Sequence, residues 1–254
     1  MSGARPQPWG DAKPQDLSLI KELPRIRVEY GKGDRLAFLG HLEVLETQNR
    51  CIRRARLPFS IGNGFARRMR IQFSQALPVG ASSTCEYFDL RLSEEIPADE
   101  VLARLRAATP PALAPTRAAY VEGRVPALES WLTRSRWEVL VRDCAVDARE
   151  LSCRIAALRD SGVLEYLRGE KKKTIDVSSA LVSWECRDAE GGVALTLDTR
   201  SSNAGALRPQ LLIDRALTGA AAGSVGYDCL KVCRVSQAHE DENSGLLVKP
   251  LRSE

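Results

Sequence analysis

The chain has 254 residues, of which 44% are hydrophobic and 28% charged, and its formal net charge is +4, the composition of a folded globular protein rather than a disordered or collagen-like one. It contains no apolar run of the roughly 20 residues that a membrane-spanning helix needs, so we expect no membrane partner. Seven cysteines without a C-x-x-C pair indicate reduced thiols, and we expect a cytoplasmic protein.

The first part of the chain is a polar, proline-containing leader, followed by segments with alternating apolar residues or with helical apolar spacing. Pro58 ends the first helix, and arginines occupy the open face of the strand that follows. The predicted order is strand, helix, strand, strand, helix, strand, over residues 25–30, 41–56, 68–73, 87–92, 99–108 and 116–121. This order is the split βαβ, or ferredoxin-like, pattern.

A second round of similar elements follows. A strand is predicted over 137–141, and Asp147 with Glu150 forms a capping-box-like start for a helix. One or two strands are expected within 163–184, then a strand over 193–197, a helix beginning near Pro209 and a closing strand over 232–235.

The sequence therefore predicts an α+β protein with two ferredoxin-like (split βαβ) domains in tandem. The expected division is a flexible leader (1–22), a first domain with an arginine-rich patch (23–123), a linker (124–133), a second domain (134–238) and a polar tail (239–254).

Positive charge is concentrated in one segment of the first domain. Residues 47–85 contain no Asp or Glu and seven arginines, so this segment carries +7 and the rest of the chain −3, the difference between +4 and +7. Arginine binds phosphate or carboxylate with two parallel hydrogen bonds and stacks on bases, which favours an anion or nucleic-acid interface over a merely solvated helix. The residues expected to bind substrate or nucleic acid are His41, Arg50, Arg53, Arg54, Arg56, Gly64, Phe65, Arg67, Arg68, Arg70, Lys171 and Lys173.

Few residues suggest chemistry. Glu86, Asp89 and Asp176 are candidate carboxylates, either acid/base groups or ion-pair partners of the arginines. With only two histidines, His41 and His239, a multi-histidine metal site is excluded, and we expect neither a metal nor a cofactor. The aromatic residues near the arginines are Phe59, Phe65, Tyr87 and Phe88, and each is either a core residue or a surface on which a base stacks.

An ordered series of short motifs carries a family resemblance. The series is Arg35–Glu43, Arg53-Arg54-Ala55, Leu57-Pro58, Gly64-Phe65, Ala76–Gly80 and Glu86–Asp89, with weaker counterparts at Lys173–Val177 and Arg208-Pro209. It resembles the radical-SAM-associated (radical-SAM-linked) proteins, a bacterial family of unknown function found next to or fused to radical-SAM enzymes. The chain departs from the family after Phe65, where Ala66-Arg67-Arg68-Met69-Arg70 is more basic than usual.

The resemblance implies that the chain acts with a radical-SAM enzyme. The residue three beyond Cys233 is Ser236, so the three-cysteine pattern that binds a radical-SAM cluster is missing and the chain is not itself such an enzyme. We expect an accessory protein that presents an RNA or a ribonucleoprotein through its arginine-rich surface. The alternatives are a stand-alone enzyme that modifies or cleaves RNA, and a protein-interaction subunit whose arginines dock on an acidic partner surface.

Overall fold

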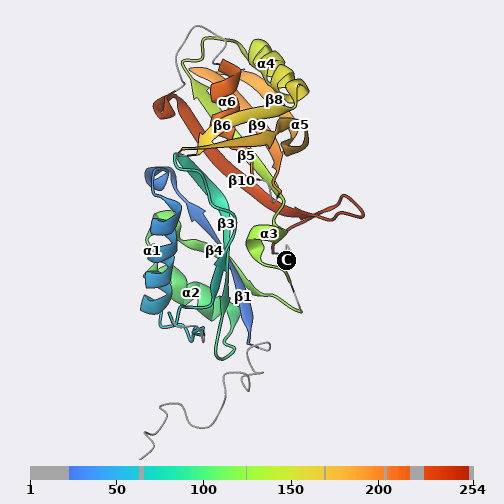
Figure 1. The fold of residues 1–254 in the computed structure, drawn as a ribbon. Helices are drawn as coiled ribbons and strands as arrows, with labels where there is room; N and C mark the ends of the chain where they lie inside the picture. Colours follow the sequence, from blue (N-terminus) through green and yellow to red (C-terminus); the bar gives the residue numbers. More distant parts are fainter. Residues whose placement is uncertain are drawn as a thin grey trace, which may run out of the picture.

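The protein has a mixed α+β fold built on one large sheet, which confirms the α+β part of the predicted fold class (Figure 1). The computed structural model describes residues 23–62, 66–123, 125–168, 170–202, 205–217 and 226–251.

The first half of the chain forms strands and helices in the predicted order. They are β1 (Arg25–Lys32), α1 (His41–Arg54), β2 (Ile71–Phe73), β3 (Ala81–Arg91), α2 (Ala98–Ala108) and β4 (Pro115–Tyr120). β1 lies between β4 and β3, β2 pairs with β3, and all three pairings are antiparallel. β2 is shorter than predicted and β3 begins earlier, because the first residues of β3 pair with a strand from the far end of the chain.

The second half continues the same sheet. Its elements are α3 (Leu128–Trp131), β5 (Arg134–Arg142), α4 (Ala148–Ser161), β6 (Val163–Arg168), β7 (Lys171–Asp176), α5 (Val177–Ala180), β8 (Leu181–Ala189), β9 (Gly192–Arg200), α6 (Pro209–Leu217), β10 (Leu230–Glu240) and β11 (Leu247–Val248). β10, β5, β9 and β8 follow one another in antiparallel order, and β6 pairs with β7 in a separate hairpin.

The two halves are joined where β10 runs parallel to β3. Val232 lies opposite Ala81, and Arg234 lies opposite Ser83. The same edge of β3 is occupied further along by β2, with Phe73 opposite Phe88. Since one sheet passes through both halves, their division into two tandem domains stays a prediction.

Each half has its own apolar core. In the first, Ile26 and Val28 of β1 pack with Val44 of α1 and Leu105 of α2. In the second, α4 and α6 pack on β5, β9 and β10, and the first half contributes Leu77 and Ala81 to this core. The segment before β3 is therefore held between the two halves.

The other face of the first-half sheet is covered, although the sequence predicted an open face. Successive side chains of β1 point to opposite faces of the sheet. Arg25 and Arg27 therefore lie on the face that points away from α1 and α2. Asp89 of β3 accepts hydrogen bonds from the Nε atoms of both arginines at 2.7 Å, and all three residues are buried. Figure 1 shows α3 and the C-terminal end of the chain lying together beside this half.

The covering layer comes from the expected linker and tail. Leu128 begins α3, Leu132 follows it, and both pack with Leu251 on Cys85 and Tyr87. Trp131 of α3 lies over the Arg27 guanidinium, with 4.9 Å from its carbon to the ring centre, and Arg27 donates to the carbonyl of Pro250. β10 extends to Glu240, past the expected start of the tail at 239, and the apolar side chain of Leu251 is buried.

The packing of Leu251 gives a stability prediction. Leu251 is 4% exposed and Leu246 is 68% exposed, in the same C-terminal segment. We expect Leu251→Ala to lower the free energy of unfolding by about 2–5 kcal/mol through the lost contacts and the cavity left behind. Urea unfolding followed by circular dichroism measures this difference, with Leu246→Ala as the matched control. Equal effects of the two substitutions would show that the terminus does not pack on the sheet.

The buried ion pairs give a second prediction. Asparagine in place of Asp89 is nearly the same size but leaves Arg25 and Arg27 buried without a countercharge. We expect Asp89→Asn to cost about 3–5 kcal/mol of unfolding free energy, as for other buried pairs that lose one partner. Exposed Asp160→Asn is the control, also measured by urea unfolding. A loss no larger than that of the control would mean that water reaches the two guanidinium groups.

Candidate nucleic-acid interface

The predicted arginines fall into two groups, and one of them lines a shallow groove of about 470 Å³. Helix α1 contributes Arg50 and Arg53 to this groove, and the chain just before β2 contributes Arg68. We refer to it as the arginine groove; its lining is Leu45, Glu46, Asn49, Arg50, Arg53, Arg68, Met69, Ile71 and Phe73. Arginines on both sides of residues 63–65 therefore lie on one surface.

Local structure explains how the groove forms. Helix α1 buries Val44, Cys51 and Ile52 against the sheet, so Arg50 and Arg53 point to solvent. β2 pairs with β3 through Ile71 and Phe73, which brings Arg68 beside the helix.

The groove arginines have few acidic neighbours. Arg50 forms an exposed ion pair with Glu46 at 2.5 Å, and the Arg53 guanidinium carbon lies 5.5 Å from the centre of the Phe59 ring. Asn49 also lines the groove, and its buried Oδ1 atom accepts no hydrogen bond within the described part of the chain.

The other predicted arginines lie outside the groove. Arg54 donates to the carbonyl of Ala108 and Arg70 to that of Ile61. Arg56 and Arg67 are exposed and adopt positive φ angles of 52° and 40°. Gly64 and Phe65 lie outside the described residues.

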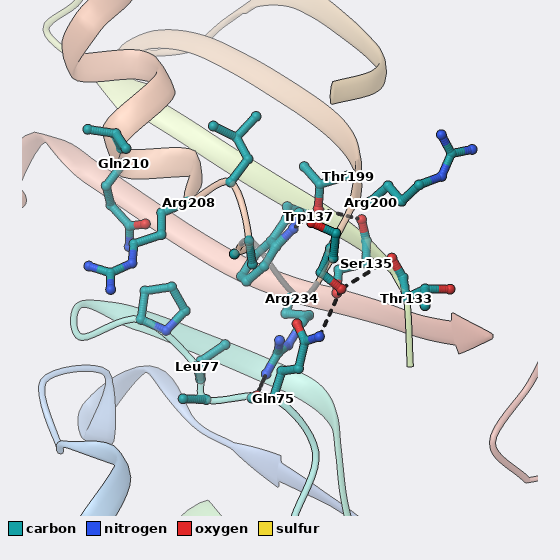
Figure 2. A pocket seen from close by; sticks show the side chains of 18 of the residues that line it. Gln75, Leu77, Thr133, Ser135, Trp137, Thr199, Arg200, Arg208, Gln210 and Arg234 are labelled. Carbon is teal, nitrogen blue, oxygen red and sulfur yellow. Dashed lines mark hydrogen bonds between the residues drawn. The ribbon is translucent and has the colours of Figure 1, made fainter. Parts of the chain in front are cut away.

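A larger cleft of about 2130 Å³ lies between the two halves. One wall is the segment 75–79 with His41, and the other is formed by β6, β7 and the start of α6. Figure 2 shows Gln75 and Leu77 below this space, Arg208 and Gln210 at its upper left, and Trp137 and Thr199 to their right. Predicted Lys173 lines the cleft, as does Lys172, whereas Lys171 is exposed and does not appear in its lining.

His41 connects the two hollows. It begins α1 and lines the cleft, and its ring meets the ring of Phe73, which lines the arginine groove, at 6.5 Å between centres. Lys32 fixes the preceding segment by donating from Nζ to the carbonyls of Ala37 and Leu39, both at 2.9 Å. Burial lowers the pKa of the His41 imidazole from its ordinary value, although the carboxylates of Glu86 and Glu129 oppose this shift.

The three candidate carboxylates are all engaged. Asp89 joins Arg25 and Arg27 as described above. Glu86 is buried and accepts two hydrogen bonds from Arg234, at 2.8 and 2.6 Å, at the join of the two halves. Asp176 caps α5, and its hydrogen bond from the Ser178 hydroxyl lowers the pKa of this exposed carboxyl.

Sequence reasoning missed several residues of the cleft. Gln75 donates to the Ser201 hydroxyl at 2.8 Å, and its carbonyl accepts from Arg234 at 2.9 Å. Both polar side-chain atoms of Gln210 are buried without a hydrogen-bond partner among the described residues. The family resemblance was the one signal in the sequence that could have located the cleft. Several residues of its motifs line the cleft, namely His41, Ala76–Val79, Lys173 and Arg208.

The part of the chain that the structure describes contains no group of three or more His, Cys, Asp or Glu side chains placed to hold a metal ion. None of its helices combines the length and the apolar character needed to cross a membrane.

Comparison with solved structures gives distant similarities. A chain of the "Crystal Structure of a Cbf5-Nop10-Gar1 Complex" matches with 10% sequence identity and a TM-score of 0.45, over 94% of this chain and 57% of that one. This chain thus spans 57% of the length of that relative. The first two RRM domains of yeast poly(U)-binding protein Pub1 match with 10% identity and a TM-score of 0.22, over 83% of this chain and 98% of that one.

A search among curated proteins gave no match. A family model does match, over residues 25–209, which is more than half of the chain. The protein therefore belongs to the bacterial family described as "Uncharacterized protein conserved in bacteria (DUF2344)".

Proposed function

We propose that this protein is an RNA-binding accessory protein that acts with a radical-SAM enzyme and holds its RNA in the arginine groove. The observation that carries the RNA part is the convergence of Arg50, Arg53 and Arg68 on one groove from both sides of residues 63–65. The radical-SAM part rests on the resemblance alone.

The groove suits the backbone of a nucleic acid. Guanidinium groups bind phosphate oxygens with two parallel hydrogen bonds, and Arg53 and Arg68 are exposed. The half-buried ring of Phe73 provides apolar surface in the same groove, on which a sugar or base can lie. The buried acceptor of Asn49 offers a partner to a base amino group or a ribose hydroxyl.

One face of the first-half sheet is covered by α3, so we assign RNA binding to the arginine groove beside α1. Many small α+β domains read RNA on an open sheet with stacked aromatic residues. Here Tyr87 is buried under α3, and its hydroxyl donates to Glu29 at 2.7 Å. Phe88 is buried in the first core. We therefore assign neither aromatic residue to base stacking.

The groove assignment is tested by Arg53→Ala combined with Arg68→Ala. We expect affinity for a 12-nucleotide single-stranded RNA to fall roughly tenfold, since each exposed ion pair contributes up to about 1 kcal/mol. The slope of log K against log salt should fall by about 1.4, because each phosphate contact with a single strand contributes about 0.7. Fluorescence anisotropy across a salt series measures both quantities.

The matched control removes two exposed arginines from the second half, Arg142→Ala with Arg187→Ala. It has the same net charge as the groove variant. Equal losses in the two double variants would assign binding to net charge and reject the groove. Unchanged RNA affinity in the groove variant, with loss of binding to an acidic protein, would favour the protein-docking alternative.

The radical-SAM part has a separate test. Tagged protein is recovered from an anaerobic extract of its bacterium with and without ribonuclease, and retained proteins are identified by mass spectrometry. We expect a radical-SAM protein with its iron–sulfur cluster to be retained. Its absence under both conditions would reject this part and leave the RNA measurement unaffected.

A further inference from the structure

We propose that the cleft between the two halves receives one end of the RNA strand whose backbone lies in the arginine groove. This proposal rests on the proposed function and names what occupies the second, larger hollow. The ligand class is the terminal nucleotides of a single-stranded RNA, with phosphate toward α6 and a base near Gln210.

The groove and the cleft adjoin each other. Phe73 lines the groove, His41 lines the cleft, and the two rings meet edge to face. Arg50 and Arg53 lie further along the helix that His41 begins, so a strand following α1 toward its start reaches the cleft. A volume of about 2130 Å³ exceeds what one small ligand needs, roughly 300–1,000 Å³, and is sufficient for more than one nucleotide.

One end of the cleft is suited to phosphate. The wall formed by β6, β7 and α6 carries Arg208, Lys172, Lys173 and Arg215 together with the acidic Glu165 and Asp214, and α6 begins beside Arg208 at Pro209. Backbone N–H groups in the first turn of a helix have no partner within the helix and favour an anion. The cationic side chains of this wall outnumber its two carboxylates, and the start of α6 adds N–H donors beside Arg208.

Gln210 is the independent observation that points to a ligand. Its amide nitrogen and oxygen are both buried in the cleft wall, and neither has a hydrogen-bond partner in the described structure. A buried unpaired amide costs free energy unless a partner supplies the missing bonds. One donor and one acceptor side by side match the edge of a nucleic-acid base.

The opposite end of the cleft is acidic. Glu240, Asp241 and Glu242 line it, and hydrogen bonding from Arg200 lowers the pKa of the Glu240 carboxyl to about 2. Arg134 and Arg200 compensate Glu240, so Asp241 and Glu242 are the carboxylates that repel phosphate there and direct a strand entering past His41 toward α6.

Photo-crosslinking tests the path. Three 12-nucleotide oligouridines carry a single 4-thiouridine at the 5′ end, the centre or the 3′ end, and cross-linked peptides are identified by mass spectrometry. We expect one end to label residues 75–79 or 207–211 and another position to label residues 45–53 or 66–73. Labels confined to the groove segments would overturn the proposal while leaving the proposed function intact.

Charge reversal provides the second arm. Lys173→Glu with Arg208→Glu should abolish the cleft cross-link, retain the groove cross-link and lower the salt slope by about 1.4. The control is Arg142→Glu with Arg187→Glu, which makes the same charge change outside both hollows. If the control loses the cleft cross-link equally, the cleft assignment is wrong.

Gln210→Leu separates a binding role from a structural one. Removing an unpaired buried amide should raise the urea midpoint of the free protein and weaken RNA binding severalfold. A lower midpoint with unchanged RNA affinity would show that Gln210 serves the fold. If the unmodified protein binds none of the oligouridines in the anisotropy assay, the proposed function fails and this inference fails with it.

Discussion

The shared edge of β3 is the constraint on which the architecture depends. β2 occupies one part of this edge and β10 the other, so strands far apart in the sequence meet along a single neighbour. A buried ion pair, Arg234 with Glu86, fixes the second pairing, since neither charge is tolerable in the interior without the other. The Ser83 hydroxyl adds a bond to the carbonyl of Arg234 at 3.1 Å. Because this edge joins the halves, it also positions the segment 75–79 against the second core.

The same constraint explains why polar residues gather at the base of the cleft. Strands β2 and β10 occupy different parts of one edge of β3, so a gap lies between them. The backbone at this gap lacks regular strand partners. Ser74 satisfies the backbone groups of Tyr87 there. Its N–H donates to the carbonyl of Tyr87, and its hydroxyl accepts a hydrogen bond from the Tyr87 N–H. The carbonyl of Gln75 is satisfied by Arg234. The cleft therefore opens at a point where hydrogen-bonding groups are already concentrated.

Local patterns in the sequence predicted local features well. Helical spacing located α1 and its exposed arginines, and Asp147 caps α4 by accepting from the N–H of Glu150. The covered sheet face was not predictable in this way, because its cover comes from α3 and Leu251, distant in the chain. The apolar spacing of Leu128, Trp131 and Leu132 did carry a signal for a buried helical turn. The sequence carried no signal for the unpaired amide of Gln210, because a missing hydrogen-bond partner becomes visible only in the packed structure.

The covered face also limits how the molecule can meet a large partner. Arg25 and Arg27 would be a strongly charged patch on an open sheet, but here Asp89 compensates one of their two charges and backbone carbonyls accept their other hydrogen bonds. Compensated buried charges contribute little potential at the surface, whereas Arg53 and Arg68 stand exposed on the helix side. An anionic partner is therefore attracted to the side that also holds His41 and the opening between the halves. Covering one sheet face thus directs long-range electrostatic attraction toward the exposed arginines of the arginine groove.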